Sequence, residues 1–161
     1  MTLREFYLQR RQAEFPVFMR VLKALPKDQL NYKPHDRSPS AGQLVWTLTN
    51  ELKACVNVVK ENKAEWNSAP PPPIDEMLKM FEQLSSELTD RVSKMDEAAW
   101  TRMAQFYVNG KVVSEQPVET FLWFIHFDAI HHRGQLSAYL RPMGGKVPAI
   151  YGPSADERPG A

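Results

Sequence analysis

The sequence predicts an all-α bundle of four helices in a single domain that spans residues 1–161. In four long segments, apolar residues recur at i, i+3 and i+4, the spacing of one buried helix face. The stretches between these segments collect proline, glycine and asparagine, which end helices. A chain of 161 residues is long enough to bury one substantial core and too short to favour two domains.

The first predicted helix covers residues 2–24, and Pro16 can bend it. The connection over residues 26–39 is long enough to cross one end of the bundle instead of forming a tight hairpin. Ser40, or Ser38 before it, then caps the second helix. The core-facing residues of the first helix are Leu3, Tyr7, Phe18, Val21 and Leu25.

The second predicted helix covers residues 41–62, and Glu51 falls within its buried arc. The proline run over residues 69–73 cannot be helical and predicts a stiff polyproline spacer. The third predicted helix, over residues 74–95, carries an apolar stripe and looks purely structural. The other residues of the second helix's buried arc are Leu44, Leu48, Leu52, Cys55 and Val59.

Between the third and fourth helices the helical spacing fails. The turn dipeptide Asn109-Gly110 is flanked by residues that favour strands, which predicts a small hairpin or an ordered loop over residues 106–113. The fourth predicted helix covers residues 118–140 and is stopped by a proline and two glycines. The apolar tail over residues 147–156 is expected to pack on the domain.

Composition excludes several classes of function. Twenty Lys and Arg against nineteen Asp and Glu give a formal net charge of +1, without the basic excess that phosphate contacts require, so we expect no nucleic-acid partner. No apolar run approaches the roughly 20 residues of a membrane span, so we expect no membrane insertion. The N-terminal segment lacks a signal peptide's apolar stretch, which predicts a cytoplasmic protein. The single Cys55 is expected to pack in the core, and a metal would need nitrogen and oxygen ligands.

A carboxylate and an imidazole, Asp128 and His132, lie four residues apart in line with the apolar residues of the fourth helix. The pattern predicts that they are buried together. A buried carboxylate costs several kcal/mol unless something pairs with it, and a metal ion satisfies both groups at once. The whole stripe consists of Phe121, Phe124, Ile125, Asp128, His132, Gln135, Leu136 and Tyr139.

Two hypotheses account for these groups. In the first, Asp128, His132 and Glu51 hold a divalent transition metal between helices, with Ni, Zn, Mn and Fe(II) all suited to an Asp/Glu/His ligand set. In the second, the same three residues form a hydrogen-bond and salt-bridge network that fixes helix register without an ion. Spacing alone favours neither hypothesis.

For other residues of the fourth helix we expect structural roles. His126 and His131 project from other sides and are expected in surface or helix contacts. Arg133 is expected to make a salt bridge or to bind backbone carbonyls near the tail. Gly134 is expected to admit a neighbouring helix closely, within the chain or across a dimer.

The run from Asp128 through His132, Arg133 and Gln135 to Gly145 resembles the signature helix of the DinB/YfiT-like superfamily. The resemblance extends to residues 30–34 and 43–48 and so covers most of the chain. It implies a four-helix bundle with up-up-down-down topology, often a homodimer, with a divalent metal such as nickel or zinc between helices. Members with known activity include S-transferases and isomerases that use bacillithiol, mycothiol or glutathione, and many others have no assigned reaction.

The usual site of that superfamily has three histidines, one on the second helix and two at H-x-x-x-H spacing on the fourth. His132 matches the last of these, whereas Asp128 stands at the preceding histidine position and Thr47 at the second-helix position. Asp128 can still ligate through oxygen, Thr47 would be a poor ligand, and Glu51 one turn on can replace it. The resemblance therefore implies Asp128, His132 and Glu51 as the metal ligands. We expect Thr47, Trp46 and Tyr107 in the wall of a substrate pocket.

Two functions follow as expectations. The first is a divalent-metal-binding protein that catalyses thiol S-transfer or hydrolysis, in which the metal lowers the pKa of a small-molecule thiol or a water. The alternative is a metal-free, non-catalytic binding or dimerisation bundle with the same fold. A third function, DNA binding, is disfavoured by the neutral charge balance.

Overall fold

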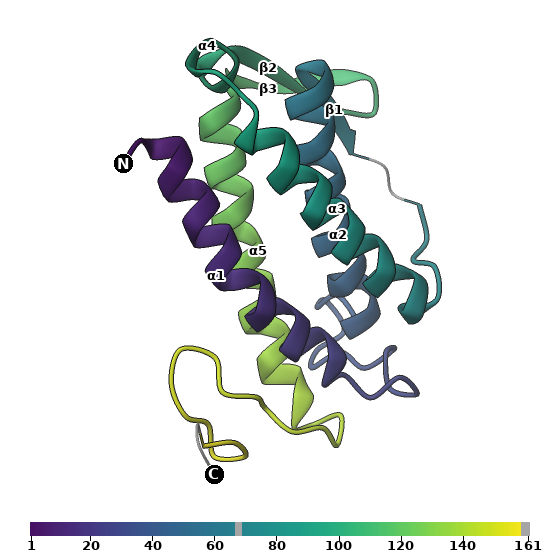
Figure 1. Ribbon diagram of the computed structural model, residues 1–161. Helices are drawn as coiled ribbons and strands as arrows, with labels where there is room; N and C mark the ends of the chain where they lie inside the picture. The colour runs from purple at the N-terminus through teal and green to yellow at the C-terminus, as the bar shows by residue number, and fades with distance from the viewer. Residues whose placement is uncertain (67–68, 159–161) are drawn as a thin grey trace.

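Four long helices lie side by side, and a small sheet with one short helix closes one end of the bundle (Figure 1). The computed structural model describes residues 1–66 and 69–158. Every helix predicted from the sequence is present, with bounds within two residues of those expected. The long helices are α1 (Leu3–Lys23), α2 (Ala41–Glu61), α3 (Ile74–Ser93) and α5 (Val118–Leu140).

Capping residues set the helix boundaries. Thr2 accepts from the backbone N–H of Glu5 and the Glu5 side chain reaches back, which forms a capping box at the start of α1. Ser40 and Gln43 form the same box on α2, so Ser40 and not Ser38 is the cap. Pro16 lies inside α1, and α1 continues past it to Lys23.

A three-stranded sheet corrects the all-α prediction. It consists of β1 (Lys63–Trp66), β2 (Met103–Val108) and β3 (Lys111–Pro117), in the order β1-β2-β3. Strands β2 and β3 form the expected hairpin, and Asn109 and Gly110 adopt positive φ at its turn. Strand β1 pairs parallel to β2, and the short helix α4 (Glu97–Thr101) precedes β2. Strand β1 and helix α4 were not predicted, because four or five residues are too few to show a helical or strand period.

The directions of the helices correct the up-up-down-down prediction. Helix α2 ends at β1 and α5 begins after β3, so these two helices are antiparallel. Helix α3 leads to the same sheet and is parallel to α2, whereas α1 runs with α5 (Figure 1). Gly145, after the end of α5, packs against the carbonyl oxygen of Ala24 at the end of α1. The order is therefore one helix down, two up and one down.

The length of the second connection explains this order. The connection between α2 and α3 starts with β1 at the sheet end, and its residues 69–73 lead into α3 at the opposite end of the bundle (Figure 1). A connection of twelve residues can reach at most about 40 Å, whereas a 20-residue helix such as α3 is about 30 Å long. The polyproline spacer lies in this return segment, and its stiffness suits it to such a span.

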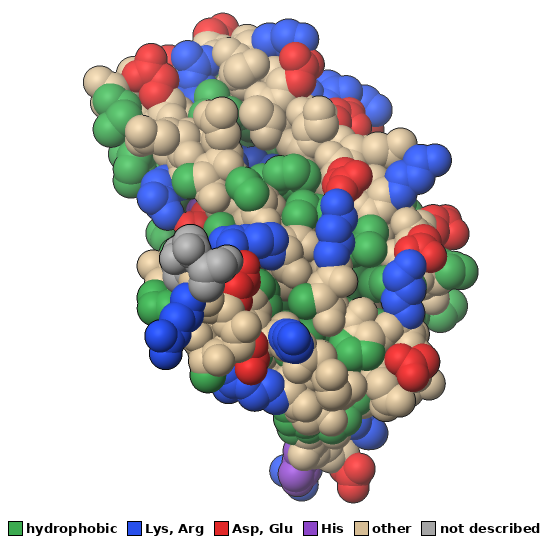
Figure 2. Space-filling model, turned by 60° about the horizontal axis from the view of Figure 1, so that its bottom comes forward, with side chains coloured by type: hydrophobic (Ala, Val, Ile, Leu, Met, Phe, Trp, Pro, Cys, Tyr) green, Lys and Arg blue, Asp and Glu red, His purple; other side chains and the backbone are tan. Residues whose placement is uncertain are grey.

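The core lies between the four long helices, and the C-terminal tail packs against it. Ala149 is buried, and Val147 and Ile150 contact the core cluster, which confirms the prediction for the tail. Acidic and basic side chains are interspersed over the face at the end opposite the sheet (Figure 2). Within residues 1–66 and 69–158, no helix is long and apolar enough to cross a membrane.

Two predictions for α5 are wrong. Phe124 was expected on the buried stripe, but 60% of its surface is exposed. Outside α5's own backbone, no described atom lies within 4 Å of the position that a Cβ would take at Gly134, so the prediction of a close helix within the chain is wrong there, and a close approach across a dimer stays a prediction. The error at Phe124 arises because apolar residues occur on every side of α5, so their spacing does not identify one buried face.

Candidate metal centre

Glu51 on α2 faces Asp128 and His132 on α5, which brings together the three residues predicted as ligands. One potential ligand atom from each residue lies within 4.8 Å of the other two. The Nε2 atom of His132 is 3.5 Å from Oε1 of Glu51 and 3.7 Å from Oδ2 of Asp128. Two helices thus place one nitrogen and two carboxylate oxygens around a common point.

Burial differs among the three side chains. The Glu51 side chain is 3% exposed, that of His132 20% and that of Asp128 39%. The prediction that Asp128 and His132 are buried together is therefore wrong for Asp128. The cluster is closed on the α2 side and open to solvent beside Asp128, which leaves a route for a ligand to approach.

Gln135 determines which nitrogen of His132 faces the cluster. The Nδ1 atom of His132 is 2.8 Å from Oε1 of Gln135. Because an amide oxygen only accepts, we assign the ring proton to Nδ1, which leaves the lone pair of Nε2 directed at the two carboxylates. A lone pair facing two carboxylate oxygens requires a proton or a metal cation between them. A hydrogen bond on the far nitrogen is also the usual support of a metal-binding histidine.

Glu51 is the least satisfied member of the cluster. Its Oε2 atom is buried and has no hydrogen-bond partner among the described residues. Burial, together with the nearby Asp128 carboxylate, raises the pKa of Glu51 to about 9. Without a cation the side chain therefore holds a proton at neutral pH, and a bound cation would replace that proton.

The distances fit a transition-metal ion. Ligand atoms held about 2.1 Å from an ion at tetrahedral angles lie about 3.4 Å apart, close to the 3.5 and 3.7 Å measured from Nε2 of His132. The donor set of one imidazole and two carboxylates suits Zn, Mn, Fe(II) or Ni. Three protein ligands leave a coordination position for water or substrate. Among the described residues, no Lys or Arg forms a salt bridge with Glu51 or Asp128, so without an ion only His132 and the proton on Glu51 offset the two carboxyl groups.

The residues predicted for the pocket wall line two surface hollows, and neither hollow includes Glu51, Asp128 or His132. Thr47 and Trp46 line a surface hollow beside residues 33–39, and the indole N–H of Trp46 donates to the carbonyl of Ala69. Tyr107 lines a separate hollow at the sheet, where its hydroxyl donates to Gln105. Their part in substrate binding stays a prediction.

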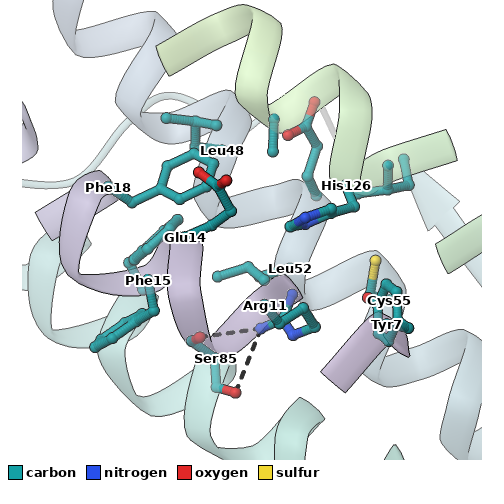
Figure 3. A pocket seen from close by; sticks show the side chains of 14 residues that line it. Tyr7, Arg11, Glu14, Phe15, Phe18, Leu48, Leu52, Cys55, Ser85 and His126 are labelled. Atoms are coloured by element: carbon teal, nitrogen blue, oxygen red, sulfur yellow. Dashed lines mark hydrogen bonds between the residues drawn. The ribbon is translucent and has the colours of Figure 1, made fainter. Parts of the chain in front are cut away.

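An interior cavity adjoins the cluster, and Glu51 forms part of its wall. The cavity lies between α1, α2, α3 and α5 and has a volume of about 30 Å³, room for little more than a water molecule (Figure 3). His126 also lines this cavity, and burial lowers its pKa to about 4, so its imidazole is neutral at pH 7. His131 is exposed and lies beside His132 without joining the cluster.

Sequence analysis missed a buried polar group on α1. Arg133 makes a salt bridge with Glu14, which confirms that prediction, and Tyr151 of the tail hydrogen-bonds to both residues. Arg11 lies one turn before Glu14 and is also buried. A signal was present, because Arg11 and Glu14 fall between Tyr7 and Phe18 at helical spacing.

The fold and this cluster define a mostly helical bundle protein with a candidate metal centre between its second and last long helices. The chain belongs to the DinB family, whose sequence profile matches residues 2–159. A Bacillus subtilis protein, YjoA, described as uncharacterized, is 26% identical over 132 residues, which cover 74% of this chain and 77% of YjoA.

Solved structures share this fold. The crystal structure of the DinB-like YjoA superposes with a TM-score of 0.68 at 20% identity, covering 87% of this chain and 93% of that one. A DinB-like protein from Bacillus cereus gives 0.75 at 18% identity, with 91% and 97% covered. A mycothiol-dependent maleylpyruvate isomerase gives 0.58 at 12% identity, and the match covers 90% of this chain but 62% of the isomerase. At these identities the likeness shows the fold.

Proposed function

We propose that this protein is a metal-dependent enzyme whose divalent transition ion, Ni, Zn, Mn or Fe, is held by Glu51, Asp128 and His132. The observation that carries the proposal is the convergence of His132 Nε2 with one oxygen of Glu51 and one of Asp128, 3.5 and 3.7 Å away. The unpartnered oxygen of Glu51 supports it, because a buried carboxylate oxygen without a partner is costly. The reaction we propose is transfer of a small-molecule thiol or hydrolysis.

The residues around the centre suit such chemistry. When bound, the ion supplies a Lewis acid that lowers the pKa of a coordinated thiol or water. Gln135 holds the His132 ring in the tautomer that directs Nε2 inward. Glu51 closes the buried side and excludes water there, whereas the 39% exposure of Asp128 leaves a path from solvent. A thiol as reactant is supported by the shared fold of the mycothiol-dependent isomerase.

Metal analysis tests this proposal. Inductively coupled plasma mass spectrometry of untagged protein should find near one equivalent of a transition metal in the wild type and none in Asp128→Ala/His132→Ala. His131→Ala is the matched control, because this neighbouring histidine is exposed and lies outside the ligand cluster. Equal metal content in the wild type and the double variant, or no uptake after incubation with nickel and zinc, contradicts the proposal.

We also propose that two copies of the chain associate through an exposed aromatic face of α1 and α5. Phe124 and Phe127 are 60% and 62% exposed. Trp123 lies 5.6 Å from both Phe6 and Phe127, measured between ring centroids, so the aromatic side chains form a continuous surface. An apolar surface of this kind is typical of a protein interface. If the chain binds no metal, this face favours the alternative function, a non-catalytic dimerisation bundle.

A further inference from the structure

An uncharged row of exposed residues runs along α5. Its members follow one another at alternating steps of four and three residues, the spacing of the seam along which two helices pack in a coiled coil. The solvent-facing side of a helix is usually polar or charged, so a row without Lys, Arg, Asp or Glu indicates a surface that another molecule covers. The outer row of α5 consists of Thr120, Phe124, Phe127, His131, Gly134 and Ala138.

Large and small side chains lie at opposite ends of the outer row. Phe124 and Phe127 lie toward the start of α5 and are 60% and 62% exposed. Gly134 and Ala138 lie toward its end, and outside α5's own backbone no described atom comes within 4 Å of the Cβ position at Gly134. A row with bulk at one end and open space at the other is complementary in shape to the same row run in reverse.

We propose that α5 of one copy pairs antiparallel with α5 of a second copy along the outer row. The steps of four, three, four, three and four residues read the same in both directions, so every position meets one position of the partner. A parallel pair would instead set Phe124 against Phe124 and Gly134 against Gly134, which leaves bulk and space unmatched. The antiparallel pair sets Phe124 against the partner's Gly134, Phe127 against the partner's His131 and Thr120 against the partner's Ala138.

Charge complementarity also favours a second copy as the partner. Asp128 follows Phe127 directly, so the partner's His131 lies beside its carboxylate, which is 39% exposed. An imidazole N–H can donate a hydrogen bond to a carboxylate oxygen. The second copy therefore borders the open side of the candidate metal centre, although the three ligands lie within one chain. This inference rests on the proposed association of two copies and gives its arrangement.

Disulfide cross-linking tests the arrangement. The single native cysteine, Cys55, is buried, so only an introduced cysteine should react under mild oxidation. Thr120→Cys and Ala138→Cys, oxidised together, should form a mixed disulfide dimer that intact mass identifies. Each variant oxidised alone should stay largely unlinked, since the two copies of either position lie about 27 Å apart along an antiparallel pair.

A substitution at Gly134 tests the fit of the two helices. Gly134→Leu should weaken the dimer at least tenfold in sedimentation velocity, because leucine takes the space of the partner's Phe124. The chain itself has room for this side chain, and leucine favours a helix more than glycine does, so circular dichroism should show an intact fold. Gly134→Ala is the matched control, and its dimer affinity should stay within about threefold of the wild type.

The outcomes separate this arrangement from the proposed association. A disulfide dimer of either cysteine variant alone would indicate a parallel pair and overturn the arrangement, and so would an unchanged dimer in Gly134→Leu. A wild-type dimer whose cysteine variants form no mixed disulfide overturns the arrangement and leaves the association standing. A wild type that is monomeric at every concentration overturns both. Metal content decides the metal centre separately, because none of the substituted residues is a proposed ligand.

Discussion

His132 and Gln135 lie three residues apart on α5, and the 2.8 Å contact between Nδ1 and Oε1 fixes the imidazole with its other nitrogen toward Glu51. This contact orients the His132 ring so that Nε2 can act as a metal ligand. An imidazole free to take either tautomer would face the carboxylates with an N–H for part of the time. Gln135 is therefore a positioning residue of the proposed centre.

Gln135→Leu should lower metal affinity about 10- to 100-fold without loss of the fold, since supporting hydrogen bonds to metal-binding histidines contribute effects of this size. Competition with a chelator for zinc would measure the affinity. Gln135→Glu keeps an oxygen acceptor and should retain most of it. Unchanged affinity in Gln135→Leu would show that Nδ1 does not need this partner.

Glu51→Gln should abolish metal binding and leave the metal-free fold at least as stable as the wild type. Burial and Asp128 raise the pKa of Glu51 from 4.5 to about 9, so the folded metal-free protein binds one proton more than the unfolded chain between these values. The contribution of this group to stability therefore falls as pH rises from 4.5 to about 9, and glutamine removes that dependence.

Thermal unfolding of both proteins with a chelator, at pH 5 and pH 8.5, would measure this difference. The advantage of Glu51→Gln should be larger at the higher pH. A wild type that is the more stable of the two at pH 8.5 would contradict the prediction, and so would a glutamine variant that retains the metal.

The salt bridge between Glu14 and Arg133 should make the fold sensitive to acid. Burial raises the pKa of Glu14, but hydrogen bonds from Arg133 and Tyr151 outweigh it, so the pKa lies below 4.5. A lowered carboxyl pKa contributes stability that is present above the unfolded value of 4.5 and is lost as pH falls through the folded value. Glu14→Gln should lower the free energy of unfolding by about 3–5 kcal/mol at pH 7, because it breaks a buried ion pair.

Urea unfolding at pH 7 and pH 3 would measure this effect, and the difference between wild type and Glu14→Gln should shrink at pH 3. Asp75→Asn is the matched control, because the salt bridge of Asp75 with Lys27 is exposed and should contribute at most about 1 kcal/mol. An equal loss in the free energy of unfolding for the two substitutions would show that burial does not strengthen the salt bridge of Glu14.

The helices could be predicted because their ends carry local signals. The capping boxes at Thr2 and Ser40 and the prolines before α3 and α5 mark boundaries within a few residues. The direction of a helix depends instead on whether the connection before it stays at one end of the bundle or crosses to the other. The sequence showed that residues 69–73 are stiff but not that the connection between α2 and α3 returns to the opposite end of the bundle. Strand β1 depends on β2, about 40 residues later, and has no local signal of its own.

The candidate site was predictable in part. Glu51, Asp128 and His132 are brought together as expected, because their places on two helices determine which side chains meet. The exposure of Asp128 was not predictable, since Phe124 in the same stripe made a solvent-facing side of α5 look buried. Arg11 was overlooked because α1 carries many charges, although its helical spacing from Tyr7 and Phe18 places it on the buried face.

Phe127→Asp should convert the proposed homodimer into a monomer. The side chain of Phe127 is 62% exposed and continues the aromatic surface through Trp123 to Phe6, so a carboxylate there would have to be desolvated at a paired interface. Sedimentation velocity over a range of concentrations would give the association state. Val113→Asp is the matched control, because Val113 is similarly accessible at 58% but lies on β3 and not on α1 or α5, and this change should leave the dimer intact. A wild type that sediments as a monomer at every concentration would refute association through this face. A dimer that persists in Phe127→Asp would place the interface elsewhere.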